Sequence, residues 1–124
     1  MARRSAAPAV DRTLKALADP TRRRVVELLR TQPRRAGDIA AGLGMSAPAT
    51  SRHLRVLHRS GLIEDVSVVD DARVRVFRLR PAPLAELSAW LSEVEQFWRV
   101  QLDAFTTHVE RTGARSAQSP RRKR

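Results

Sequence analysis

The sequence contains no cysteine among its 124 residues. Disulfide bonds, thiolate metal ligands and thiol nucleophiles are therefore excluded. The sequence also lacks a glycine-rich phosphate loop, a recognisable metal-ligand spacing, and a nucleophile with a base nearby. We therefore predict that the protein is not an enzyme and needs no cofactor.

Long hydrophobic runs are missing as well. No window approaches the roughly 18 uncharged apolar residues of a membrane span, and the N-terminal Met-Ala-Arg-Arg-Ser lacks the apolar core of a secretory signal. We expect a cytoplasmic protein with no membrane partner. The length leaves room for one domain of modest core, and the 42% hydrophobic content is ordinary for a globular chain.

Positive charge is what the sequence has in excess. The formal net charge is +11, and lysine occurs only at Lys15 and Lys123, so nearly all of the cations are arginines. Such a charge favours polyanionic partners, nucleic acid above all. The charge is uneven, because residues 20–62 hold nine arginines against two acids whereas residues 83–110 hold five acids against one arginine. This separation predicts a defined binding face and a different role for the C-terminal segment.

Residues 46–62 have the pattern of a helix built to bind DNA. Ser46 is a good N-cap, a proline is tolerated in the first turn, and Gly61 closes the helix. At about 100° per residue, one face is predicted to enter the core and carries Thr50, His53, Leu54 and Leu57. The opposite face is predicted to be free and carries Pro48, Ser51, Arg52, Arg55 and Arg59. A surface of arginines and a hydroxyl without an acid suits phosphates and base edges, whereas the bland alternative is a solvated cationic helix.

The flanking segments complete a winged helix-turn-helix. Residues 36–43 show the spacing of a short amphipathic helix, and Gly44 provides the tight turn before Ser46. Two β-prone runs follow at residues 62–69 and 74–79, which predicts a hairpin, the wing. The fold class is thus predicted to be mainly α with a small β-hairpin.

Further helices are predicted on either side of this motif. Residues 10–18 form a first short helix, and Asp19-Pro20 starts a second that runs to Arg30. A long amphipathic helix is expected from about residue 83 to 110, and its apolar stripe needs a partner surface. The simplest partner is the same helix of a second copy, giving a two-fold homodimer. We expect residues 10–110 to form the domain, with disordered basic segments at 1–9 and 111–124.

Three stretches together resemble the ArsR/SmtB-type bacterial repressors over about residues 10–110. They are Leu14-Lys-Ala-Leu-Ala-Asp-Pro-Thr-Arg-Arg, Ser51-Arg-His-Leu-Arg-Val-Leu and Gly61-Leu-Ile. The resemblance implies a homodimeric winged helix-turn-helix that represses its own operon and is often released by a metal ion or another effector.

The metal sites of that family do not carry over to this sequence. Its cysteine cluster has no counterpart, because the corresponding stretch offers only Ala36 and Asp38. In the C-terminal helix, Asp103, His108 and Glu110 are spaced so that they do not face together. The C-terminal helix, with Trp90-Leu91 and Phe97-Trp98-Arg99, is similar to a subgroup of the family that lacks metal ligands. This leaves open an unknown small-molecule effector near Trp90 and Trp98, although we assign these tryptophans to the dimer core.

We predict a DNA-binding transcriptional regulator that acts on an operator with two-fold symmetry in double-stranded DNA. An unspecific DNA-coating or architectural protein is the alternative, favoured by the net charge and the basic tail. The residues predicted to read bases are Pro48, Ser51, Arg52 and Arg55. The residues predicted to contact phosphates are Arg22, Arg23, Ser46, Arg59, Arg73 and Arg75, although solubility alone could explain Arg22 and Arg23. The residues predicted to form the dimer interface are Val10, Leu14, Leu84, Leu87, Leu91, Val94, Trp98 and Phe105.

Overall fold

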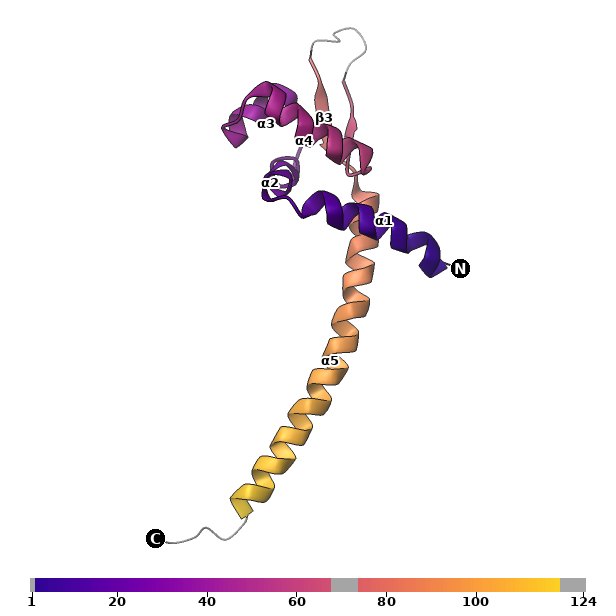
Figure 1. Ribbon diagram of the computed structural model, residues 1–124, viewed down its shortest axis with the longest axis vertical. Coiled ribbons are helices and arrows are strands. Elements are labelled where there is room, and N and C mark those ends of the chain that lie inside the picture. Colours follow the sequence, from indigo (N-terminus) through magenta and orange to yellow (C-terminus); the bar gives the residue numbers. More distant parts are fainter. Residues whose placement is uncertain (1, 68–73, 119–124) are drawn as a thin grey trace. The chain divides into compact units, whose positions relative to one another are not determined.

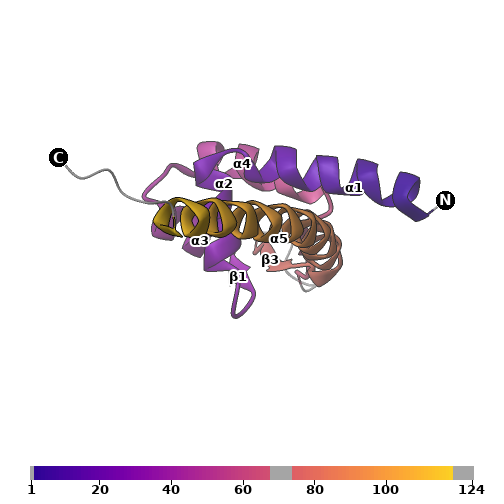
Figure 2. The ribbon, with the colours of Figure 1, turned by 90° about the horizontal axis from the view of Figure 1, so that it is seen from below.

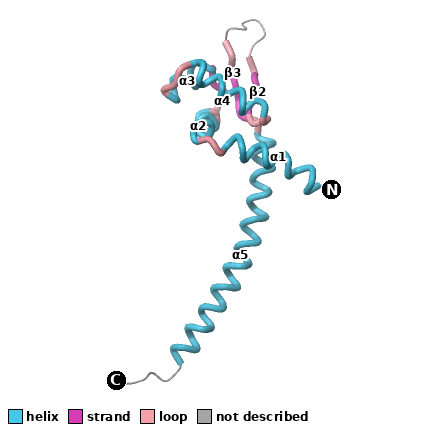
Figure 3. The backbone as a smooth tube through the Cα atoms, viewed as in Figure 1, coloured by secondary structure: helices cyan, strands magenta, loops and turns pink. Residues whose placement is uncertain are grey.

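The computed structural model describes residues 2–67 and 74–118, with side chains for residues 8–67 and 74–113. The chain divides into two units, Met1–Ser88 and Ala89–Arg124. The described elements (Figures 1 and 3) are α1 (Ala2–Leu17), α2 (Pro20–Leu28), β1 (Arg34–Arg35), α3 (Ala36–Leu43), α4 (Ala47–Arg59), β2 (Ile63–Asp65), β3 (Val76–Leu79) and α5 (Pro81–Gln118). The predicted fold class, mainly helical with a small hairpin, is confirmed.

The sheet has three strands rather than the two of the predicted hairpin. The strand order is β1-β3-β2 and both pairings are antiparallel, with Ile63 opposite Leu79 and Arg34 opposite Phe77. Strand β1 was missed because two consecutive arginines carry no hydrophobic alternation. Its pairing with β3 is a tertiary contact, which no local pattern encodes. Seen from below, β1 lies on the opposite side of the first unit from α1 (Figure 2).

The hydrophobic core of the first unit lies between α1–α4 and the sheet. The start of α5 also reaches this core, because Leu84 packs against it. The buried side chains come from α1–α4, β2 and β3, and from the residues next to α2 and β2. They are Ala16, Val25, Leu29, Ile39, Leu43, Leu54, Leu57, Leu62, Ile63 and Phe77.

Both terminal helices are longer than expected. Helix α1 begins at Ala2 rather than near Val10, and α5 begins at Pro81 and continues to Gln118. The helical parts of residues 2–9 and 111–118 therefore differ from the disordered segments that we expected. Alanine is the best helix former, and residues 2–9 contain four alanines, so local propensity favours a helix despite the basic composition and Pro8.

Two buried threonines differ in how their hydroxyl groups are satisfied. Thr13 and Thr50 are each 1% exposed. The Thr13 hydroxyl donates to the Ala9 carbonyl oxygen at 3.1 Å, whereas the Thr50 hydroxyl oxygen has no hydrogen-bond partner. Burial of a polar group without a partner costs free energy, because the group has lost its hydrogen bonds to water. Helix α4 therefore carries a local destabilising group on its buried face.

We predict that Thr50→Val raises the free energy of unfolding by about 1 kcal/mol, because valine has nearly the same shape and removes the unpaired hydroxyl. Urea denaturation followed by circular dichroism measures this change. Thr13→Val is the matched control and should bring no gain, since its hydroxyl already has a partner. Equal stabilisation by both substitutions would contradict the prediction.

Candidate nucleic-acid interface

Helices α3 and α4 are joined by the predicted tight turn. Helix α3 ends at Gly44, whose φ of +65° lies in the left-handed region that glycine adopts without a steric penalty. Two residues later, the Ser46 hydroxyl accepts a hydrogen bond from the Ala49 backbone N–H at 3.3 Å and starts α4. Helix α4 ends before Gly61, which has a φ of +78°. The predicted caps of this helix are confirmed.

Helix α4 has the two faces that the sequence predicted. Thr50, Leu54 and Leu57 are buried and His53 is partly buried. The opposite face, with Pro48, Ser51, Arg52, Arg55 and Arg59, is exposed. The rotation of the helix about its axis thus presents these five residues to solvent.

Three arginines of the exposed face are available to a partner. The ion pairs found in the described part of the chain all use other arginines, and Arg52, Arg55 and Arg59 take part in none of them. A guanidinium group without an internal acceptor keeps all of its donors for phosphate oxygens or for guanine O6 and N7. This face of α4 can therefore bind an anionic partner without breaking internal contacts.

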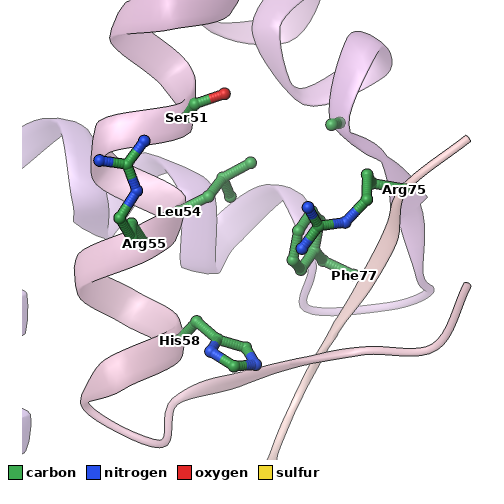
Figure 4. A pocket seen from close by; sticks show the side chains of 7 residues that line it. Ser51, Leu54, Arg55, His58, Arg75 and Phe77 are labelled. Atoms are coloured by element: carbon green, nitrogen blue, oxygen red, sulfur yellow. The ribbon is translucent and has the colours of Figure 1, made fainter. Parts of the chain in front are cut away.

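The hairpin brings a further arginine beside α4. Arg75, just before β3, donates from Nε to Asp65 Oδ2 at 2.7 Å, and its guanidinium lies 5.3 Å from the centroid of the Phe77 ring. Between α4 and β3 lies an open hollow of about 190 Å³ (Figure 4). Ala36, Ser51, Leu54, Arg55, His58, Arg75 and Phe77 line it. Arg73, also predicted to contact phosphates, lies outside the described residues.

Arg22 and Arg23 contact the end of α1. Arg22 donates from Nε to the Ala16 carbonyl oxygen at 2.6 Å, and Arg23 donates from Nη1 to the Leu17 carbonyl oxygen at 2.7 Å. Cations at a helix C-terminus stabilise its unpaired carbonyl groups. This capping role explains both arginines without a phosphate. Sequence reasoning missed it because it depends on the angle between α1 and α2.

The N-cap predicted at Asp19 is present. Asp19 accepts hydrogen bonds from the Thr21 and Arg22 backbone N–H groups.

Sequence reasoning also missed Arg34. This arginine donates from Nε to the carbonyl oxygen of Leu28, the last residue of α2. The contact joins the end of α2 to β1. Like Arg22 and Arg23, Arg34 is one of the nine arginines of the basic segment 20–62 but serves an internal contact. The net charge of that segment therefore overstates the charge that is free to meet a partner.

The residues predicted for a dimer interface differ in their accessibility. Val10 is 4% exposed and belongs to the core of its own chain, so its side chain offers little surface to a second copy. Leu14 is 40% exposed, while Leu84, Leu87 and Val94 are partly buried. In the single chain, α5 leaves many large apolar side chains exposed by 40–64%. These are Trp90, Leu91, Phe97, Trp98, Val100, Leu102, Phe105 and Val109.

Residues 2–67 and 74–118 contain neither a candidate metal centre nor a candidate membrane span. No three His, Asp or Glu side chains there come together as metal ligands. None of the helices there combines the length and apolar character needed to cross a bilayer.

A helix-turn-helix with an exposed cationic second helix and an adjacent hairpin is the architecture of a DNA-binding transcriptional regulator.

Comparisons with known proteins agree with this class. Residues 19–65 match the family described as bacterial regulatory protein, arsR family. The chain is 36% identical over 103 residues to the HTH-type transcriptional regulator Rv2034 of Mycobacterium tuberculosis, covering 83% of this chain and 91% of that protein. It is 39% identical over 56 residues to the transcriptional repressor SdpR of Bacillus subtilis, covering 45% of this chain and 62% of the relative.

A solved structure shows the same fold. It is the homodimeric winged helix-turn-helix DNA-binding domain Mb0332 of Mycobacterium bovis, with a TM-score of 0.57 and 28% identity, covering 72% of this chain and 80% of that one. The protein belongs to the arsR family of bacterial regulatory proteins.

We predict that Asp19→Asn lowers the free energy of unfolding at neutral pH by less than about 1 kcal/mol, because the amide oxygen can still cap α2 but carries no charge. The hydrogen bond from the Arg22 backbone N–H is the main cause that lowers the Asp19 pKa from its ordinary value of 3.8. Since the folded-state pKa is depressed, the carboxylate stabilises the fold above pH 3.8 and this contribution is lost as the pH falls through the folded-state pKa.

The difference in stability between wild type and Asp19→Asn should therefore shrink on acidification. Urea unfolding at a series of pH values measures it. A difference that grows as the pH falls would contradict the assigned role of the carboxylate.

Proposed function

We propose that the protein is a homodimeric repressor that binds a two-fold symmetric operator, with one α4 in each of two successive major grooves. In this arrangement the half-sites lie roughly 34 Å apart on one side of the duplex. The observation that carries the proposal is the exposed arginine face of α4, which has no acidic residue and no internal ion pair among the described residues. The related repressor SdpR and the homodimeric Mb0332 domain support the repressor and dimer assignments.

Arg52 and Arg55 with Ser51 are proposed to read bases, and Pro48 is proposed to contact them from the first turn. The Arg52 and Arg55 side chains are exposed on the same face of α4, and arginine can bridge two acceptors of one guanine. Ser46 and Arg59 stand near the two ends of the helix, where the duplex backbone passes a helix lying in the major groove. Arg73 and Arg75 are proposed to supply phosphate contacts from the hairpin. The capping contacts of Arg22 and Arg23 do not favour a phosphate role for them.

The segment 83–110 is proposed to supply the dimer contact. Its apolar residues at 84, 87, 91, 94, 98 and 105 keep the alternating three-four spacing of a helix that packs lengthwise on another helix. Leu91, Trp98 and Phe105 are 43%, 55% and 64% exposed in the single chain, and an exposed apolar stripe of this length needs cover. A second copy provides an identical stripe, which a two-fold axis brings face to face.

We predict that Arg52→Ala weakens binding to the operator by about 1–3 kcal/mol per half-site and leaves binding to random-sequence DNA nearly unchanged. Gel-shift titrations at fixed salt, with DNA from upstream of the gene and with random DNA, measure both affinities. Arg59→Ala is the matched control and should weaken both complexes alike, as expected for a phosphate contact. Equal losses for Arg52→Ala on both DNAs would refute base reading and favour the unspecific DNA-coating alternative.

We predict that Leu91→Asp makes the protein monomeric, because it places two buried carboxylates in the helix pairing. Sedimentation velocity measures the mass. Loss of the linked second DNA-binding unit should weaken operator binding by about a hundredfold or more. Ser92→Asp introduces the same charge one residue away from the apolar stripe and should stay dimeric. A Leu91→Asp variant that remains dimeric would show that α5 does not hold the dimer.

A further inference from the structure

Asp65 holds Arg75 in one position beside α4. Its Oδ2 accepts the hydrogen bond from Arg75 Nε at 2.7 Å. Its Oδ1 accepts hydrogen bonds from the Ser67 hydroxyl and, at 2.8 Å, from the Ser67 backbone N–H. The Ser67 hydroxyl oxygen in turn accepts from the Val76 backbone N–H at 2.9 Å. Both carboxylate oxygens are thus fixed by the hairpin itself.

The Arg75 guanidinium is restrained from a second side. It lies over the Phe77 ring, 5.3 Å from the ring centroid, where a cation is attracted to the aromatic face. Phe77 is buried and paired with Asp65 across the strands, so the ring and the carboxylate lie side by side on the sheet. These contacts use Nε and one face of the guanidinium. Within residues 2–67 and 74–118 the two terminal nitrogens of Arg75 have no hydrogen-bond acceptor.

The hollow between α4 and β3 has the chemistry of an anion site. Its polar side chains are Ser51, Arg55 and His58 from α4 and Arg75 from the hairpin, and its remaining lining is apolar. None of the seven lining residues is acidic. Figure 4 shows Arg75 and Phe77 across the hollow from Leu54 and the other α4 side chains. Arg75 supplies the guanidinium donors that proteins use for DNA phosphate oxygens, and it lies across the hollow from the Ser51 and Arg55 side chains that are proposed to read bases.

We propose that this hollow receives one phosphate group of the DNA backbone, and that Asp65 is the positioning residue that holds Arg75 for that contact. The proposal rests on the proposed DNA-binding function and extends it to a defined phosphate and to a residue that does not itself touch DNA. An acid on a DNA-binding face repels the duplex, so charge alone predicts that Asp65 weakens binding. Preorganisation predicts the opposite, because a fixed guanidinium loses less side-chain freedom when it binds.

The hairpin offers a matched control for charge. Glu64, the neighbour of Asp65 on β2, forms ion pairs with Arg78 and with Arg80, the latter at 3.6 Å. None of these three residues lines the hollow. Asp65→Asn and Glu64→Gln therefore remove the same charge from adjacent residues. The first weakens the pairing of Arg75, and the second weakens that of Arg78 and Arg80. Only the first releases the arginine that faces α4.

The test is the affinity of both variants for a duplex of arbitrary sequence and for DNA from upstream of the gene, at several salt concentrations. Glu64→Gln should bind as tightly as wild type or more tightly. Asp65→Asn should bind both duplexes roughly five- to tenfold more weakly, the size expected for the loss of one ordinary hydrogen bond. In the Arg75→Ala background, Asp65→Asn should have no further effect. Arg75→Ala itself should reduce the slope of log affinity against log salt by about 0.9 per hairpin.

Tighter binding by Asp65→Asn, equal to that of Glu64→Gln, would overturn the proposal. Urea unfolding of each variant checks that the hairpin is intact. If Asp65→Asn is unstable, Arg75→Lys replaces it, because lysine keeps the charge but cannot bond Asp65 and a phosphate through separate nitrogens. Arg75→Lys should then weaken binding, while Arg78→Lys should not. Absence of any preference for upstream DNA by wild type would instead count against the proposed operator function and leave this phosphate test intact.

Discussion

Leu54 and Leu57 are buried beneath α4, and their packing fixes the rotation of that helix about its axis. Because successive residues of a helix are about 100° apart, burial of this face leaves Arg52, Arg55 and Arg59 no orientation except toward solvent. The Ser46 cap and the left-handed Gly44 set where the helix begins. The arginine face that we propose as the DNA-reading surface thus depends on apolar packing rather than on any contact made by the arginines themselves.

The arginines of this small protein have different physical roles despite their shared charge. Arg22, Arg23 and Arg34 donate to carbonyl oxygens at the ends of α1 and α2, so they stabilise helix ends. Arg78 pairs with Glu64 of β2, and Arg75 pairs with Asp65 through Nε alone. The net charge of +11 is therefore a poor measure of the surface available to a polyanion. Which arginine is free is decided by which acceptors the fold brings within reach.

The exposed surface of α5 is apolar, whereas that of α4 is cationic. Phe97, Leu102 and Phe105 are more than half exposed in the single chain, whereas the core of the first unit is filled by its own elements. The apolar residues of α5 extend beyond a narrow stripe, and a broad stripe buries more area against a partner than a narrow one. In the proposed function the contact between copies is apolar and the contact with DNA is cationic, so dimerisation and DNA binding use different chemistry in one short chain.

The sequence by itself determined the helices on either side of the tight turn, their caps, the turn itself and the two faces of α4, because each depends on residues within a few positions of one another. Asp19, Ser46 and Gly44 act through neighbouring backbone groups, and the periodicity of residues 46–62 is local. Only the tertiary structure decided that Arg34 joins a third strand, that Val10 is core, and that Asp65 holds Arg75. Those contacts join residues that are distant in sequence, or they depend on how whole elements pack together. Neither can be predicted from the spacing of residues along the chain.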